Sequence, residues 1–296
     1  MTDRRAPSIG IKTTPADVSY AEIRRVWLEA DAVPEVEHAW LYDHLLPRVG
    51  DPSGPAYEGW TLLTALAAQT RRLRLGLLVT NNRIRLPAVL AKIAATVDVI
   101  SGGRLDFGIG VGGLPDPALN AAEFDAFGIP IDPWPDAVAA CAEACSLIRR
   151  MWTEDVFDFS GDHYVLAGAR GNPKPIQRPH PPILIGGSGT TTLRIVADHA
   201  DIWNVIGPPR NTVEHLRGRS RVLDEQCAAI GRDPDQITRS VQIPVAYDDP
   251  ASARECVCEL VDAGFSHVVL NIPAPYPVDV VRWVTDELIR PTLEHA

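Results

Sequence analysis

The chain has 296 residues, 46% hydrophobic and 22% charged, a composition typical of a soluble protein with a large apolar core and not of a disordered chain. Its formal net charge of −10 provides no large positive field, so we expect neither nucleic acid nor an anionic membrane as a partner. No apolar run approaches the roughly 20 residues of a membrane span, and the first residues lack a signal-type stretch. We therefore predict a cytoplasmic protein. The odd number of cysteines, five, predicts free thiols.

Short apolar segments alternate with segments of helical period, which is the pattern of a parallel sheet with connecting helices. The predicted strands are Ser8–Lys12, His38–Asp43, Arg72–Val79, Arg104–Gly110, Pro182–Gly187, Asp201–Ile206, Ile237–Tyr247 and Ser266–Ile272. The predicted helices are Tyr20–Val33, Glu58–Thr70, Pro87–Ser101, Asp136–Trp152, Thr191–His199, Thr212–Ile230, Ala251–Ala263 and Val278–Leu293. Eight such units favour a (β/α)8 TIM barrel, with an open doubly wound sheet as the alternative.

One long interval, between the fourth and fifth predicted strands, interrupts this rhythm. It holds one helix, a segment rich in proline and aspartate, and a short predicted hairpin at 156–166. We therefore predict a single domain over residues 1–296 with an insertion at about 114–180. Insertions in the βα loops of a barrel shape its active face, so we expect the substrate to bind there.

A barrel carries its chemistry at the carboxyl ends of its strands. Asp43 and His44 follow the second strand, which places a carboxylate and a side chain that titrates near neutral pH on the active face. These two are the predicted catalytic residues, although an isolated histidine is more often structural, and that alternative stays open for His44. Neither H-x-H nor H-E-x-x-H occurs, so no metal site is predicted.

Glycine-rich segments follow the fourth and fifth strands. The first, GIGVGG at 108–113, has the spacing of a dinucleotide-binding turn, but Pro115 and Pro117 oppose the helix that such a turn must open. Glycines at a strand end instead let a flat ligand approach the backbone. In the second, glycines and Ser188 precede a helix rich in threonine, which predicts a phosphate site. The alternative is that Ser188 or Thr190 only caps the helix.

Five long motifs occur in order: DHLLP from Asp43, EGWTLLTALAAQTRRLRLG from Glu58, VTNNRIRLPAVLAKIAATVDVISGGRLDFGIGVG from Val79, KPIQRPHPPILIGGSG from Lys174 and ADHADIWN from Ala197. Together they resemble the luciferase-like monooxygenase superfamily, and more narrowly its coenzyme F420-dependent oxidoreductases. The resemblance covers residues 8 to about 210. It implies a (β/α)8 barrel with a flavin or deazaflavin across its carboxyl face.

The resemblance also implies roles for individual residues. A non-prolyl cis peptide would lie behind the ring at Leu77, Leu78 and Val79, and His44 would lie near the reactive centre. The other cofactor contacts would come from Thr80, Asn81, Gly110, Gly112, Gly113, Gly186, Gly187, Ser188, Gly189 and Thr190. Trp60 and Trp203 would belong to the wall of the site or to the core.

The sequence departs from this family pattern at one position. Some F420-dependent dehydrogenases place an acid after the fourth strand, where this chain has Gly113. A proton donor would then be His44 or a residue of the insertion, such as Asp116 or Glu123.

The function implied by the resemblance is hydride transfer between C5 of coenzyme F420 and a small organic substrate, with alcohol/ketone, imine or activated C=C chemistry open. The first alternative is an FMN-dependent monooxygenase of the same fold, which uses dioxygen and a partner reductase. The second is a non-catalytic flavin-binding barrel, because a fold alone implies no function. A homodimer stays open.

Overall fold

Nine parallel strands form the main sheet, and the computed structural model describes them within residues 6–112 and 117–296. The strands are β1 (Ser8–Lys12), β2 (His38–Leu41), β3 (Arg74–Leu77), β4 (Thr80–Asn81), β5 (Phe107–Gly110), β8 (Ile183–Gly186), β9 (Ile202–Ile206), β10 (Thr238–Pro244) and β11 (His267–Asn271). Their order in the sheet is β3, β2, β1, β11, β10, β9, β8, β5, β4.

The two ends of this order meet and close the sheet. The Leu75 amide in β3 donates to the Arg104 carbonyl at 3.0 Å, and the Asp106 amide, just before β5, donates to the Leu75 carbonyl at 2.8 Å. Because β4 continues the path of β3, the nine strands occupy eight positions around a barrel. The structure confirms the predicted (β/α)8 barrel and excludes the open doubly wound sheet.

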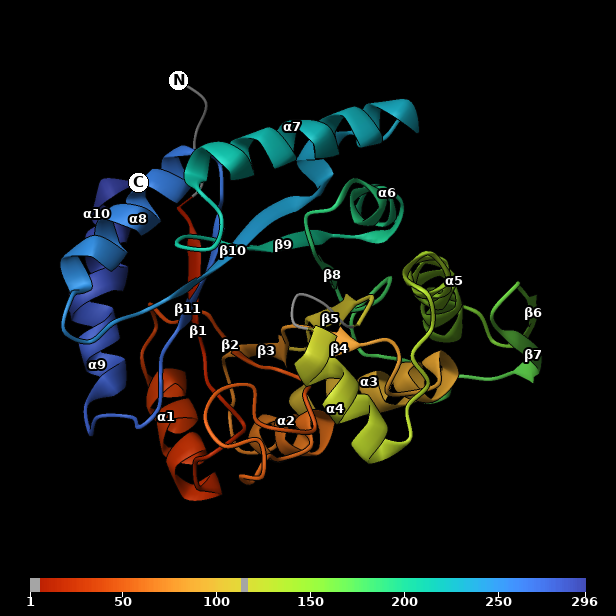
Figure 1. Cartoon of the computed structure of the whole chain (residues 1–296), viewed down its shortest axis with the longest axis horizontal. Helices are drawn as coiled ribbons and strands as arrows, with labels where there is room; N and C mark the ends of the chain where they lie inside the picture. Colours follow the sequence, from red (N-terminus) through yellow and green to blue (C-terminus); the bar gives the residue numbers. More distant parts are fainter. Residues whose placement is uncertain (1–5, 113–116) are drawn as a thin grey trace.

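Helices cover the outside of the barrel and connect its strands (Figure 1). They are α1 (Tyr20–Ala32), α2 (Gly59–Ala67), α3 (Pro87–Ser101), α5 (Trp134–Thr153), α6 (Thr190–His199), α7 (Val213–Ala229), α8 (Pro250–Asp262), α9 (Val280–Val284) and α10 (Arg290–His295). Pro87 begins α3, and Gly264, with a φ of +94°, follows α8, as expected for helix ends. The last predicted helix contains a π-helical turn, Thr285–Ile289, between α9 and α10.

The insertion contains one helix that the sequence did not predict. The expected hairpin is present as antiparallel strands β6 (Phe157–Ser160) and β7 (Val165–Ala169), which lie beyond α5 at the edge of the molecule (Figure 1). Helix α4 (Pro117–Phe127), however, lies in the segment where prolines were expected to oppose a helix. The prolines were expected to oppose a helix that starts at Gly113; α4 instead starts at Pro117, where a proline loses no intrahelical hydrogen bond.

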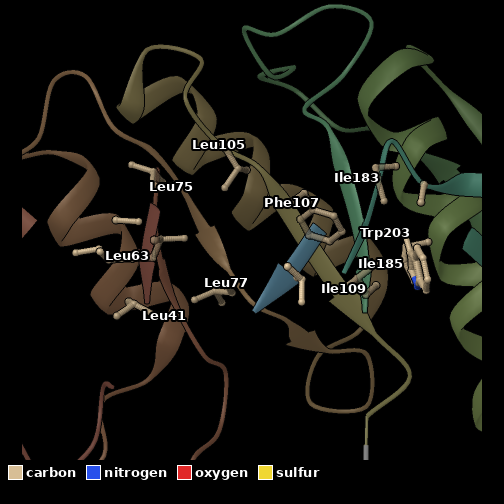
Figure 2. Close-up of a cluster of buried hydrophobic side chains, with 14 of the residues drawn as sticks. Leu41, Leu63, Leu75, Leu77, Leu105, Phe107, Ile109, Ile183, Ile185 and Trp203 are labelled. Carbon is tan, nitrogen blue, oxygen red and sulfur yellow. The ribbon is translucent and has the colours of Figure 1, made fainter. Parts of the chain in front are cut away.

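Two apolar clusters stabilise the barrel. The larger lies between strands and helices, and Figure 2 shows part of it, where Leu63 of α2 lies beside Leu75 of β3. Trp60 and Trp203 are both buried in this cluster and are therefore core residues. The smaller lies inside the barrel and contains Trp40, Leu78, Leu184, Ile202 and Val269. In the described part of the chain, no helix is long and apolar enough to cross a membrane.

Candidate functional site

The loops that follow the strands surround the carboxyl end of the barrel, called the mouth below. The peptide bond between Leu78 and Val79 is cis, as predicted for this strand edge. The Val79 side chain lies against two glycines at neighbouring strand ends: a Cβ atom on Gly110 would lie 2.7 Å from Val79 Cγ2, and one on Gly186 would lie 3.1 Å from Val79 Cγ1. Larger residues at either glycine would displace Val79, so the three positions form one continuous surface at the mouth.

Asp43 is the centre of a buried ion cluster at the mouth. Arg85 binds both of its carboxylate oxygens, at 2.6 and 3.0 Å, and also pairs with Glu58. The Thr80 hydroxyl donates to Asp43 and accepts from the indole of Trp60 at 3.0 Å. The Asp43 side chain is 0% exposed. Its oxygens are thus committed to holding the segment that follows the cis bond.

His44 belongs to a separate network. Its Nδ1 lies 3.0 Å from Glu123 Oε2, and Glu123 also accepts from the backbone amides of Leu45 and Leu46. The His44 side chain is 29% exposed, whereas that of Glu123 is only 1% exposed. Burial alone would raise the pKa of Glu123, but the hydrogen bonds and the attraction of His44 hold it below its ordinary value. The insertion therefore provides an ionised partner for His44.

The turn after β5 packs closely against β4. Gly112 has a φ of +82°, and a Cβ atom there would lie 1.8 Å from Asn81 Oδ1. Asn81 is itself fixed by two hydrogen bonds. Its side-chain oxygen accepts from the Arg83 backbone amide at 2.9 Å, and its backbone amide donates to Asp43 Oδ2 at 3.3 Å. Glycine is thus required at 112 for both conformation and space. Gly113 and Asp116 lie outside the described residues.

The segment 186–190 leads into the N-terminus of α6. Gly189 is the N-cap residue, and no side chain caps the helix, so the alternative that Ser188 or Thr190 acts as a cap is wrong. Trp203 Nε1 donates to the Gly187 carbonyl at 2.7 Å, and Arg219 donates to the Thr190 hydroxyl at 3.2 Å. The first backbone N–H groups of an α-helix have no acceptor within the helix, so those of α6 can donate to a ligand. The positive end of the helix dipole lies at the same place.

A polar side chain that the sequence analysis missed lies inside the mouth. Ile9 and Ile11 of β1 pack under the helices, so the alternation of the strand places Lys12 on the inside. Lys12 Nζ donates to Gln242 Oε1 at 2.5 Å, and among the described residues it makes no ion pair. Burial lowers the pKa of Lys12 to about 8. The only available signal was its place at the end of a period-two strand.

Hydrogen bonds continue from Gln242 toward the opposite end of the barrel. Gln242 donates to Asn204 at 3.1 Å, Asn204 donates to the Ser240 hydroxyl at 2.8 Å, and Ser240 lies 2.7 Å from His267 Nδ1. The His267 ring stacks on His38 with 4.0 Å between centroids. Burial lowers the pKa of His267 to about 4, so its ring is neutral near pH 7.

The described residues contain no group of three or more His, Cys, Asp or Glu side chains arranged to hold a metal ion.

The sequence profile of the luciferase-like monooxygenase family matches residues 11–279. The chain belongs to the luciferase-like family. Residues Gly108 to Gly110 of the GIGVGG segment therefore lie in a barrel strand of this family, β5.

The F420-dependent glucose-6-phosphate dehydrogenase of Kineococcus radiotolerans is 31% identical over 223 residues, which cover 74% of this chain and 63% of that protein. The chain thus spans less than two thirds of that relative's length.

Two solved structures show how widely the fold is shared. An F420-dependent secondary alcohol dehydrogenase in complex with an F420–acetone adduct has a TM-score of 0.83 at 17% identity, covering 97% of this chain and 99% of that one. Monooxygenase RslO1 from Streptomyces bottropensis has a TM-score of 0.75 at 22% identity, covering 97% and 98%. At these identities the likeness shows the fold.

Proposed function

We propose that the protein is an F420-dependent oxidoreductase that transfers hydride between C5 of the deazaflavin and a small organic substrate. The relative from Kineococcus supports the choice of cofactor by its name. The observation that carries the proposal is the arrangement of the mouth. Along the strand order, the His44–Glu123 pair after β2 and the free helix N-terminus after β8 lie on either side of Val79.

The residues after β8 fit the phosphate of such a cofactor. Helix α6 has no capping side chain, so a phosphate would accept from its first amides and would compensate the positive end of its dipole. Gly187 has a φ of +134°, which turns the backbone into this position, and Trp203 holds its carbonyl. We assign the phosphate to the segment formed by Gly186, Gly187, Ser188, Gly189 and Thr190. FMN carries the same group, so this segment does not choose between the two cofactors.

The surface around Val79 fits a flat ring. Gly110 and Gly186 let the Val79 side chain lie directly against the neighbouring strand ends, and a planar ring would lie over this closely packed surface. We assign the ring to this surface, with its contacts from Leu77, Leu78, Val79, Thr80, Asn81, Gly110 and Gly112. The bound deazaflavin would supply the carbon that gives or takes hydride.

In this proposal the protein's own groups move the proton and fix the geometry. The ionised Glu123 accepts from His44 Nδ1, which leaves Nε2 as the ring nitrogen that holds or releases a proton at the substrate oxygen or nitrogen. His44 is thus the proposed catalytic residue, and Glu123 sets its tautomer. Asp43 is a positioning residue, because its oxygens bind Arg85 and Thr80 and, in the described part of the chain, no hydrogen bond joins its side chain to His44.

Titration of the purified protein with F420 and, separately, with FMN tests this proposal. We expect saturable binding of F420 and much weaker binding of FMN. Ser188→Glu should weaken F420 binding by about tenfold or more, because it sets a carboxylate against the phosphate. Ser252→Glu is the matched control: Ser252 is an exposed residue in the first turn of α8, and its replacement should leave the affinity unchanged. Preferential binding of FMN would reject the F420 assignment and favour the monooxygenase alternative.

A further inference from the structure

A cavity of about 270 Å³ lies between the segment that follows β4 and the start of α5. Its polar lining comes from Asn82, Arg83, Arg85, Asp132 and Tyr164, and the rest is mostly aliphatic. Arg85 is shared with the buried cluster around Asp43, so the cavity lies directly beside the candidate site.

Two buried polar atoms at this cavity have no partner. Asn82 is 4% exposed, and its Nδ2 donates to the Tyr164 hydroxyl at 3.2 Å, but its Oδ1 accepts no hydrogen bond. The Arg83 Nε atom is also buried without an acceptor. Leaving such an atom unsatisfied costs about 1–3 kcal/mol, so a site that retains both has unused capacity for a ligand.

The cavity lining carries one positive and one negative side chain, Arg83 and Asp132, which form no ion pair with each other. Among the described residues Arg83 makes no ion pair, and its guanidinium lies 5.9 Å from the centroid of the Phe124 ring. Burial lowers the pKa of Arg83, and the Asp132 carboxylate only partly opposes that shift. The cavity therefore presents an uncompensated cation at Arg83, and acceptors at Asn82 Oδ1 and Asp132.

We propose that this cavity binds a small apolar α-amino acid in its zwitterionic form. Arg83 would bind the carboxylate, since a guanidinium matches two carboxylate oxygens. Asn82 Oδ1 and Asp132 would accept from the ammonium group, which a simple organic anion lacks. The aliphatic lining, which includes Ile84 and Ala140, would contact the side chain. The volume of about 270 Å³ admits an amino acid of the size of valine and also has room for a larger aliphatic side chain.

Calorimetric titration of the full chain, without any cofactor, tests this proposal independently of the F420 assignment. We expect L-valine to bind at one site. Isobutyrate and isobutylamine should bind at least about tenfold more weakly than L-valine, because each lacks one of its two charged groups. Arg83→Met should abolish valine binding. Arg71→Met is the control, because Arg71 is exposed and its side chain makes no hydrogen bond in the described structure.

A second variant keeps the test decisive if Arg83→Met folds poorly. Ala140→Leu should place three further carbon atoms in the cavity and weaken valine binding by about tenfold or more, while leaving F420 binding intact. No heat with L-valine, equal binding of isobutyrate, or unchanged binding by Ala140→Leu would each overturn the proposal. Failure of F420 to bind would reject the proposed function alone and would leave this result standing.

Discussion

Replacement of Glu123 tests how the insertion is held against the barrel. Glu123 lies on α4, is 1% exposed and accepts three hydrogen bonds, from His44 and from the backbone amides of Leu45 and Leu46. All three donors belong to the loop after β2. One carboxylate therefore joins the insertion to the segment that carries His44.

The size of the effect follows from these bonds. A hydrogen bond to a charged group contributes about 1.5–3 kcal/mol, and the Leu46 contact, at 3.3 Å, is the weakest of the three. Glu123→Gln keeps one acceptor oxygen but loses the charge and sets an NH2 group toward His44. We expect it to lower the free energy of unfolding by about 2 kcal/mol at pH 7. Glu123→Ala leaves two amides without an acceptor and should cost about 3–4 kcal/mol.

Urea unfolding at several pH values measures this effect. The folded state lowers the pKa of Glu123, so its stabilisation is complete above the ordinary value of 4.5 and is lost as the pH falls below it. The gap between the parent and Glu123→Gln should therefore shrink below about pH 4.5. Glu225→Gln, at an exposed position of α7, is the control and should change stability by less than about 0.5 kcal/mol. A Glu123→Gln variant as stable as this control would refute the reasoning.

Three further predictions concern other parts of the barrel. Because burial lowers the pKa of His267 to about 4, its protonation in the unfolded chain should destabilise the fold as the pH falls from 6.5 to 4, by up to about 3 kcal/mol; urea unfolding of His267→Asn should lack this component. Gly112→Ala, strained at a φ of +82° and crowded against Asn81, should lower stability by about 1–3 kcal/mol and weaken F420 binding; a melting temperature and affinity equal to the parent would contradict this. His44→Ala should lower kcat by about a hundredfold while changing cofactor affinity much less; a kcat within about threefold would remove His44 from the mechanism.

The barrel could be predicted from the sequence because each strand and helix carries its own periodic signal. The strand β1 and the helix α3 were predicted at their observed bounds. The glycines that follow β5 and β8 marked the ends of those strands, because glycine favours turns and close backbone approach. Helix α4 was missed because the segment rich in proline and aspartate around its start suggested a loop, whereas Pro117 is tolerated at the first helical position.

The contacts within the site could not be read from the sequence. Asp43 and His44 are neighbours in the chain, yet Asp43 binds Arg85 and His44 binds Glu123. Each partner is set by how the loops after different strands fold over the mouth, and no short motif records that. Glu123 was named only as one of several candidates, and the cavity beside Arg83 depends on packing between the insertion and the barrel.

Anaerobic transfer of deuterium from reduced F420 labelled at C5 tests the central claim most directly. A flavin reacts with dioxygen, whereas the deazaflavin has carbon in place of N5 and passes hydride, so the cofactor decides the reaction class. With a panel of small ketones, imines and activated alkenes as acceptors, we predict that the label appears in one product class without dioxygen or a flavin reductase, and that His44→Ala reduces the rate. Activity only with reduced FMN, or incorporation of an oxygen atom from O₂, would contradict the account.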